Sequence, residues 1–246
     1  MSDEVPIGVV HRRTSETSDS LGFFDAERHL EQPRRRLYIS KRPGIKRFSG
    51  PIGGWSKRVF DLIVSATLLL FLFPVLLAIA VAVRAERRNV VIFRQARTGF
   101  DGKPFKIYKF RTMRVCENKD VVQARPGDAR ITPVGGFLRR TSLDELPQLV
   151  NVFRGEMSLV GPRPHALDHD ADFEDRNAAY SQRRVARPGI TGLAQISGAR
   201  GTIETDDDLN RRVYYDTAYV QEWSFFEDLR ILFGTIWAVL KKDGAV

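Results

Sequence analysis

The feature that most constrains this chain is an uncharged apolar run of twenty-two residues, Leu62 to Val83. Only Ser65, Thr67 and Pro74 interrupt its apolar side chains. A helix needs roughly 20 apolar residues to span the hydrocarbon core of a bilayer, so the run is long enough to do so. The alternative is a helix buried inside a soluble protein, which is uncommon at this length. The run therefore predicts association with a membrane.

The flanking charges bear on whether the run crosses the bilayer. Basic residues stand on both sides of it, namely Lys57, Arg58, Arg84, Arg87 and Arg88. Because cytoplasmic flanks carry the excess of Lys and Arg, this pattern favours both ends on the cytoplasmic side. Phe73-Pro74 lies in the middle, where proline removes a backbone hydrogen bond and bends a helix. The sequence predicts a helix–break–helix that enters and leaves one face, although a crossing helix stays open.

The apolar run divides the chain into three parts. Residues 1–50 are polar and turn basic toward their end, so we expect a mostly disordered tail that contacts anionic membrane lipids. We expect no signal peptide, because the first residues lack a basic start and an apolar core. Residues 51–88 would form the membrane segment, and residues 89–246 a cytoplasmic domain. The single cysteine, Cys116, excludes a disulfide framework and fits a reducing, cytosol-facing body.

The net charge of +9 over 246 residues indicates an anionic partner. Three classes fit: a nucleic acid, a phosphate-rich substrate or an anionic membrane. The apolar run and the lack of a clustered aromatic RNA- or DNA-binding motif argue against a nucleic-acid partner. Phosphate and membrane partners remain.

Residues 141–164 hold the candidate chemistry. The adjacent carboxylates Asp144 and Glu145 follow Ser142, which forms an S-x-x-E capping box with Glu145. This places the acidic pair in the first turn of a helix, where the dipole favours ionised carboxylates. Gly161 to Pro164 reads as a rigid turn that holds Arg163. The pair, Arg163 and the upstream Arg139 and Arg140 could manage metal and phosphate, although such acids usually only cap a helix.

The rest of the chain predicts an α/β or α+β fold, mostly helical with a small sheet. Val90–Phe93 reads as a short buried strand and Pro104–Phe110 as its hairpin partner, around a turn at 98–102. Further expected elements are a turn at 131–136, a strand at 193–196, an exposed polar helix at 170–184, and helices at 209–223 and 229–240. The last helix is amphipathic, and a core helix and an interfacial helix are equally compatible with it. His165 and His169 have a zinc-compatible spacing on a helix, but no strong third ligand is evident.

Five ordered segments across residues 55–243 resemble the bacterial sugar transferase family, the monotopic phosphoglycosyl transferases. They are KRVFD at 57–61, VIFRQARTGFDGKPFKIYKFRTM at 91–113, the acidic stretch through GPRP at 164, RPGITGLAQISG at 187–198, and DTAYVQEWSFFEDLRIL at 216–232. The resemblance implies transfer of a sugar 1-phosphate from a UDP-sugar to a polyprenyl phosphate in the inner membrane, with release of a nucleoside monophosphate. It also implies a monotopic re-entrant helix broken at Ser-Pro; here the break reads Phe73-Pro74.

The same resemblance assigns roles to residues by position. It implies Asp144 as nucleophile in a dyad with Glu145, and Mg²⁺ as the metal, held by Asp144. Attack by Asp144 would form an acyl-phosphate that the lipid phosphate resolves. Asp216 and Lys109 match catalytic positions. The residues that match phosphate- or nucleotide-binding positions are Arg111, Arg139, Pro162, Arg163, Pro164 and Arg187.

Three alternatives stay open at this point. Pro164-His165-Ala166 resembles the branch that transfers glucose or galactose 1-phosphate at the start of exopolysaccharide synthesis, so we expect a hexose. The family includes monomers and homodimers, and the sequence does not distinguish them. A rival interpretation is a catalytically inactive, membrane-anchored scaffold of a polysaccharide-export complex, against which the intact Asp144-Glu145 pair argues.

Overall fold

The computed structural model describes residues 50–86, 90–114 and 127–240. All of them belong to one compact unit, Ile45–Val246. The predicted N-terminal tail, apart from Gly50, and Cys116 lie outside the described residues. So do Arg87 and Arg88 of the flanking charges.

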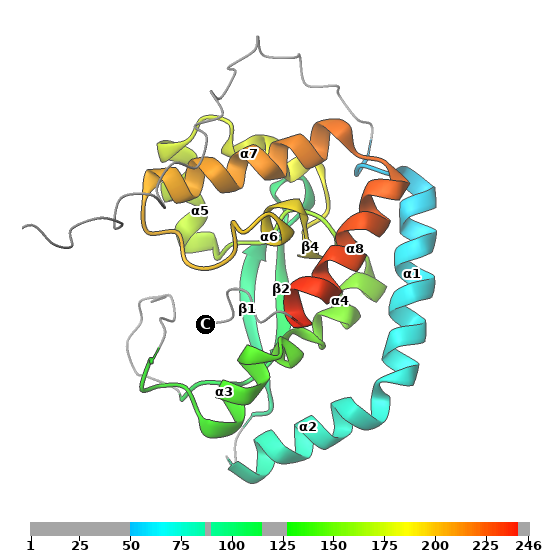
Figure 1. The fold of residues 1–246 in the computed structure, drawn as a ribbon, viewed down its shortest axis with the longest axis vertical. Coiled ribbons are helices and arrows are strands. Elements are labelled where there is room, and N and C mark those ends of the chain that lie inside the picture. Colours follow the sequence, from blue (N-terminus) through cyan, green and yellow to red (C-terminus); the bar gives the residue numbers. More distant parts are fainter. Residues whose placement is uncertain (1–49, 87–89, 115–126, 241–246) are drawn as a thin grey trace, which may run out of the picture. The chain divides into compact units, whose positions relative to one another are not determined.

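The described residues form mostly helices and two small sheets, which confirms the predicted α+β class (Figure 1). The α-helices are α1 (Gly54–Phe71), α2 (Phe73–Glu86), α3 (Pro133–Arg140), α4 (Gln148–Arg154), α5 (Leu167–Arg176), α6 (Leu193–Ile196), α7 (Asp206–Glu222) and α8 (Phe225–Leu240). The 3-10 helices are η1 (Phe100–Gly102), η2 (Leu143–Glu145) and η3 (Tyr180–Val185). The strands are β1 (Ile92–Thr98), β2 (Pro104–Phe110), β3 (Ser158–Val160) and β4 (Gly189–Thr191). β1 and β2 pair antiparallel, and β3 and β4 pair parallel.

The apolar run forms two helices, α1 and α2, that meet at a bend of 61°. Leu72 separates them, and Pro74 is the second residue of α2, where its missing N–H costs no helical hydrogen bond. The predicted helix–break–helix is therefore present. In the described part of the chain no single helix has the length and apolar character to span a bilayer, whereas the bent pair meets both criteria together.

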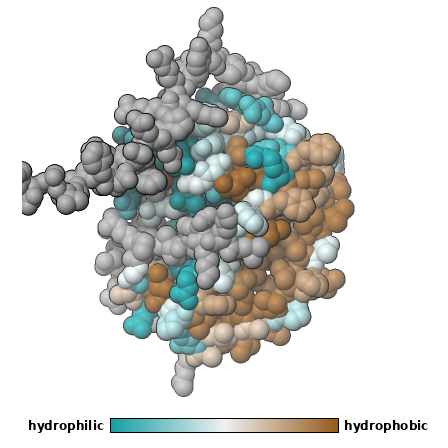
Figure 2. All heavy atoms as spheres, viewed as in Figure 1, coloured by the Kyte–Doolittle hydropathy of each residue, from teal (hydrophilic) through white to brown (hydrophobic). Residues whose placement is uncertain are grey.

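Helix α1 turns polar side chains inward and apolar side chains outward. Its buried residues are Lys57, Asp61 and Ser65, spaced four apart on one face. Lys57 Nζ lies 2.5 Å from Asp228 of α8, and Asp61 accepts a hydrogen bond from the Leu159 backbone N–H. The large exposed apolar side chains of α1 and α2 include Val59, Leu62, Ile63, Leu70, Phe71, Phe73, Val75, Leu77 and Val81. In Figure 2 these helices form a hydrophobic side of the molecule.

Three clusters of buried apolar residues hold the fold together. The largest joins α1, α4, α7, α8 and the β3–β4 sheet, and includes Val152, Val160 and Ile231. A second joins α5, η3 and α7, and a third packs α2 against β2 and α3. Helix α8 buries Ile231 but leaves Phe233 and Ile236 exposed, so it combines a core face with an apolar outer face. The burial of Ile231 agrees with the core interpretation for one face, and the interfacial interpretation of the other face stays a prediction.

Several predicted elements differ from the structure. The first hairpin strand is β1, Ile92–Thr98, and it is not buried as predicted, because each of its residues is half-buried or exposed. The predicted turn at 131–136 is the start of α3, where Pro133 takes the first position and Thr132 accepts from the Gly135 N–H as N-cap. The predicted strand at 193–196 is helix α6, and the strand of this segment is β4, two residues earlier.

Candidate active site

The acidic pair lies in the 3-10 turn η2 between α3 and α4, so its predicted place in the first turn of an α-helix is wrong. Helix α4 begins only at Gln148, after Pro147. The predicted capping box is also absent: Ser142 adopts a left-handed conformation (φ 57°), and its side chain makes no capping bond. The left-handed residue turns the chain away from α3, so the acids lie in a connection between two helices rather than in the first turn of an α-helix.

Glu145 is held by two cations. Its Oε1 lies 2.8 Å from Lys109 Nζ of β2 and 2.5 Å from Arg163 Nη2, and its Oε2 accepts from Arg163 Nη1 at 3.2 Å. Burial alone would raise the pKa of this carboxyl group, but Arg163 and Lys109 bring the pKa well below its ordinary value. Glu145 in turn raises the pKa of Arg163. The three side chains form a fixed ionic cluster in which Glu145 stays ionised.

Asp144 differs from its neighbour in almost every respect. Asp144 is buried, with 8% of the residue exposed, yet its carboxylate takes part in none of the hydrogen bonds or ion pairs between described residues. Burial raises the pKa of Asp144; Lys109, Arg139 and Arg163 act in the opposite direction, and Glu145 adds to the rise. The pair therefore divides into a carboxylate committed to cations and a carboxylate whose oxygens are unengaged.

The basic residues that the sequence predicts here come from several elements. Lys109 and Arg163 contact Glu145 directly, while Arg139 of α3 acts on Asp144 through its charge. Arg111 follows β2, and its buried Nε has no partner within the described residues. Arg187 lies elsewhere: its Nε donates to the Gly155 carbonyl at the end of α4. The structure does not bring Arg187 to the acidic pair, and its nucleotide contact stays a prediction.

The Pro162-Arg163-Pro164 turn is fixed through its backbone. The Pro162 carbonyl accepts from the Gly189 N–H at 3.0 Å, and the Pro164 carbonyl accepts from Arg97 Nη1 at 3.2 Å. The Arg163 carbonyl accepts from Arg183 Nη2 at 2.5 Å. These bonds hold the turn that carries Arg163 to Glu145, as the sequence predicts for this turn.

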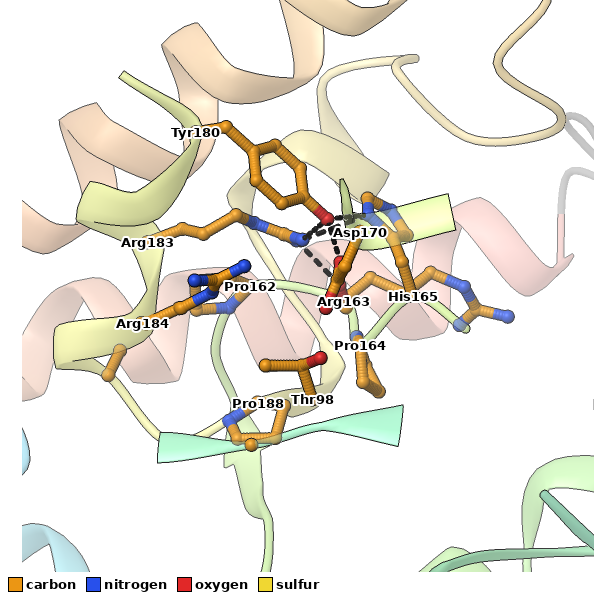
Figure 3. A pocket seen from close by; sticks show the side chains of 12 residues that line it. Thr98, Pro162, Arg163, Pro164, His165, Asp170, Tyr180, Arg183, Arg184 and Pro188 are labelled. Carbon is orange, nitrogen blue, oxygen red and sulfur yellow. Dashed lines mark hydrogen bonds between the residues drawn. The ribbon is translucent and has the colours of Figure 1, made fainter. Parts of the chain in front are cut away.

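A buried polar network contacts this turn, and Figure 3 shows its members His165, Asp170, Tyr180 and Arg183. Arg183 of η3 binds the Asp216 carboxylate of α7 at 2.7 Å and donates to the Tyr180 hydroxyl. Tyr180 also donates to Asp170 and lies 2.6 Å from His165 Nδ1. Burial raises the pKa of Asp216, and Arg183 opposes the rise. Asp216 is thus linked to the backbone of Arg163 through one guanidinium, that of Arg183, which contacts both.

The two histidines do not lie on one helix, because α5 begins at Leu167 and contains only His169 of the two. His165 precedes α5, and burial together with Arg183 lowers its pKa well below the ordinary value. A cluster of three or more His, Cys, Asp or Glu side chains fit to hold a metal is absent from the described residues. The segment 170–184 was expected to be exposed, but Asp170, Tyr180 and Arg183 are buried in the network.

A small pocket opens beside the turn (Figure 3). It is lined by Thr98, Gly99, Pro162, Arg163, Pro164, His165, Asp170, Tyr180, Arg183, Arg184, Ala186 and Pro188. Arg97 precedes Thr98 of this lining. Burial and the charge of Arg163 lower the pKa of Arg97, whereas Glu145 and Asp170 oppose this change. The pocket and the acidic pair therefore meet at the Arg163 turn.

Sequence reasoning missed three arginines that shape the site. Arg97 and Arg183 hold the turn, and Arg200 donates from the α6–α7 loop to Ser142 Oγ at 2.8 Å. Isolated arginines on a basic chain give no signal of their own. A glycine on either side of the Ala199-Arg200 pair, in the sequence Gly198-Ala199-Arg200-Gly201, was the one available hint of a tight functional loop.

Comparison with known proteins gives consistent results. The family model described as "Bacterial sugar transferase" matches residues 52–242. A Klebsiella pneumoniae protein named UDP-glucose:undecaprenyl-phosphate glucose-1-phosphate transferase is 45% identical over 241 residues, which are 96% of this chain and 52% of that protein. A Caulobacter vibrioides protein of the same name is 48% identical over 77% of this chain and 71% of its own length. The Rhizobium meliloti exopolysaccharide production protein ExoY is 42% identical over 85% of this chain and 95% of its own length. The chain spans about half the length of the Klebsiella protein.

Proposed function

Because this chain belongs to the bacterial sugar transferase family, we propose that it is a phosphoglycosyl transferase. It moves a sugar 1-phosphate from a UDP-sugar to a polyprenyl phosphate and releases UMP. The names of similar proteins specify undecaprenyl phosphate as acceptor and UDP-glucose as donor. Glucose 1-phosphate is accordingly the first group to test, in agreement with the hexose expected from the sequence.

The observation that carries this proposal is the unequal state of the two carboxylates. Glu145 is committed to Lys109 and Arg163, whereas Asp144 has no hydrogen-bond partner in the part of the chain that the structure describes. A carboxylate that attacks phosphorus needs free lone pairs and nearby cations to screen the like charge of the diphosphate. Asp144 has both, since Lys109, Arg139 and Arg163 all act on it.

The reaction proceeds in two displacements at one phosphorus. An Asp144 carboxylate oxygen attacks the phosphorus that bears the sugar, and the bond from that phosphorus to the bridging oxygen breaks. UMP leaves with the electron pair, and an acyl-phosphate joins Asp144 to the sugar. A phosphate oxygen of the lipid then attacks the same phosphorus. The Asp144 carboxylate departs, and the product is polyprenyl-diphospho-sugar.

The residues present fit a magnesium ion bound in the way that Mg²⁺ prefers. Mg²⁺ is commonly held by one or two carboxylates together with substrate phosphates, rather than by a cage of protein ligands. Asp144 offers one hard oxygen ligand of this kind beside the cationic cluster and would hold the ion. When bound, the ion neutralises charge that develops on the diphosphate. Lys109 and Arg163 hold Glu145 in place independently of the ion, and they would also contact the substrate phosphates.

We further propose that the protein is monotopic in the bacterial inner membrane, on its cytoplasmic face. The polar inner face and apolar outer face of α1 support contact of this helix with lipid. A helix that buries Lys57, Asp61 and Ser65 and exposes Leu70 and Phe71 is suited to lipid rather than to water. The 61° bend at Leu72 lets α1 and α2 re-enter the face they came from. The exposed Phe233 and Ile236 of α8 would lie at the interface with anionic lipids.

The experiment incubates the protein with UDP-glucose labelled in the phosphate next to the sugar, first without lipid acceptor. We expect a labelled protein adduct and one equivalent of UMP, both absent in Asp144→Asn. Addition of undecaprenyl phosphate should discharge the adduct into the lipid. Full turnover by Asp144→Asn, or lipid glycosylation without any adduct, contradicts the proposal. Chelation of divalent ions should abolish adduct formation, and Mg²⁺ should restore it.

A further inference from the structure

The loop between α6 and α7 places one additional arginine at the acidic turn. Arg200 Nη2 donates to Ser142 Oγ at 2.8 Å, and Ser142 directly precedes the turn η2. Within the described residues this is the guanidinium's one hydrogen bond, although a guanidinium has five N–H donors. Most of its hydrogen-bonding capacity is therefore available to another partner.

The backbone on both sides of Arg200 is held by a single buried side chain. Arg212 of α7 is 6% exposed; its Nε donates to the Ala199 carbonyl at 3.2 Å and its Nη2 to the Gly201 carbonyl at 2.9 Å. The neighbouring Arg211 donates to the Ser197 carbonyl. A loop anchored at both carbonyls that flank one residue presents that residue's side chain in a defined direction, which lowers the entropy lost on binding.

The charges around Arg200 call for an anion. Burial lowers its pKa and Arg163 lowers it further, while Glu145 and Asp144 act in the opposite direction. Glu145 is already shared by Lys109 and Arg163, so it does not satisfy a third cation. Four cations, Lys109, Arg139, Arg163 and Arg200, act on the two carboxylates Asp144 and Glu145, so positive charge exceeds negative charge around the acidic pair. A phosphate group is the ligand that such a surplus of cationic donors favours.

We propose that Arg200 binds the diphosphate of the nucleotide-sugar donor, and exchanges its hydrogen bond to Ser142 for bonds to phosphate oxygens. This inference rests on the proposed function. It extends the donor site from the hairpin and the Arg163 turn to the α6–α7 loop, so that the diphosphate lies between Arg163 and Arg200 and above Asp144.

Four variants of the full chain test the assignment through the KM for UDP-glucose in the UMP-release assay. Arg200→Ala should raise KM by about tenfold or more, which corresponds to one charge-assisted hydrogen bond, and Arg200→Lys should recover part of the loss. Ser142→Ala removes the resting bond but keeps the guanidinium, so it should not raise KM. Arg176→Ala removes an arginine that pairs with Asp172 and Asp206 on the surface, and serves as the control for net charge.

The outcomes separate a binding role from a structural role. If Ser142→Ala reproduces the effect of Arg200→Ala, or if Arg200→Ala leaves KM unchanged, Arg200 only holds the turn and the inference is overturned. Thermal stabilisation by pyrophosphate provides a second readout that needs no turnover and also reports whether each variant is folded. Loss of that stabilisation in Arg200→Ala, but not in Ser142→Ala, supports the inference. An equal shift in all variants overturns it. Absence of UMP release from wild-type protein with every UDP-sugar would instead overturn the proposed function.

Discussion

Arg183 Nη2 lies 2.7 Å from the Asp216 carboxylate, and the same nitrogen donates to the backbone carbonyl of Arg163 at 2.5 Å. Asp216 therefore acts on the acidic pair from a distance, because it fixes the guanidinium that fixes the turn. A carboxylate that the resemblance ties to catalysis has here a positioning geometry. It is 2% exposed and lies behind the residues that face Asp144.

Asp216→Asn should therefore lower both stability and turnover. Removal of one charge from a buried pair leaves Arg183 uncompensated and costs about 3–5 kcal/mol of unfolding free energy. Urea unfolding measures this loss, and the UMP-release assay should show a lower kcat from the loosened turn. The control is Asp175→Asn, an exposed carboxylate on α5 that should change stability by no more than about 0.5 kcal/mol. Wild-type stability in Asp216→Asn would contradict the buried pair.

The two members of the acidic pair should respond to neutralisation with unequal losses of stability. Glu145→Gln leaves Lys109 and Arg163 without their shared anion and should cost about 3 kcal/mol. Asp144→Asn removes a desolvated charge with no hydrogen bond in the described structure, so stability should change by less than about 1 kcal/mol. Turnover should nevertheless fall by at least about a thousandfold in Asp144→Asn. Chemical denaturation and UMP release on the same preparations give both numbers. Equal destabilisation by the two variants would contradict the asymmetry.

The dependence of rate and stability on pH should also differ between the two carboxylates, because the pKa of Asp144 is raised and that of Glu145 is lowered. In the proposed reaction Asp144 attacks as a carboxylate. Burial raises the pKa of Asp144, so adduct formation should fail as the pH drops through that raised value. The acidic limb of the rate profile should thus lie above the ordinary aspartate pKa of about 3.9. Glu145 has a lowered pKa, so its contribution to stability is present above its unfolded value and is lost as the pH falls toward the folded one. Single-turnover rates as a function of pH test the prediction for Asp144, and Tm as a function of pH tests the prediction for Glu145. An acidic limb at the ordinary aspartate value would argue against a buried nucleophile.

Close glycine contacts under the Arg163 turn provide a test of its rigidity. A Cβ on Gly189 would lie 2.1 Å from the Gly161 backbone nitrogen, a distance that forces the two segments apart. Gly189→Ala should displace the turn and reduce turnover by more than about tenfold, with a loss of several kcal/mol in stability. Gly136→Ala in α3 is the matched control, since its Cβ would meet its nearest neighbour at 3.7 Å. That variant should be neutral or slightly stabilising, because alanine is the better helix former.

The anchor of α1 can be tested at Asp228. This buried carboxylate accepts from Lys57, from the Tyr219 hydroxyl at 2.8 Å and from Trp223 Nε1 at 3.1 Å. Asp228→Leu strands all three donors and should destabilise by about 3–5 kcal/mol. Lys57→Met leaves the carboxylate with two donors and should cost less. Denaturation in detergent micelles ranks the two variants. The reverse order would show that Lys57 is the dominant partner.

The sequence was sufficient for features that depend on local composition. The length of the Leu62–Val83 run, the Pro74 bend and the hairpin turn at 98–102 each follow from a few neighbouring residues. The turn at Arg163 was also predictable, because two prolines restrict its backbone.

Features that depend on distant partners were not predictable. Ser142 matches a capping box, but its left-handed backbone and its bond from Arg200, 58 residues away, override the local pattern. The segment 193–196 has strand-like residues, yet the β3 edge pairs with Gly189–Thr191 instead. Arg183 and Arg97 reveal their roles only when the fold brings them to the backbone of the Arg163 turn.

The inward polar face of α1 has a mechanical consequence for the proposed membrane enzyme. Asp61 accepts a hydrogen bond from the backbone N–H of Leu159, and the chain enters the Pro162-Arg163-Pro164 turn three residues after Leu159. In the proposed membrane-bound state, a shift of α1 along the bilayer normal would have to break that hydrogen bond or move β3 together with the helix. If α1 is immersed in lipid as proposed, its depth sets the height of Asp144 above the bilayer surface. A thicker or thinner bilayer should then change how easily the lipid phosphate reaches the proposed phosphosugar.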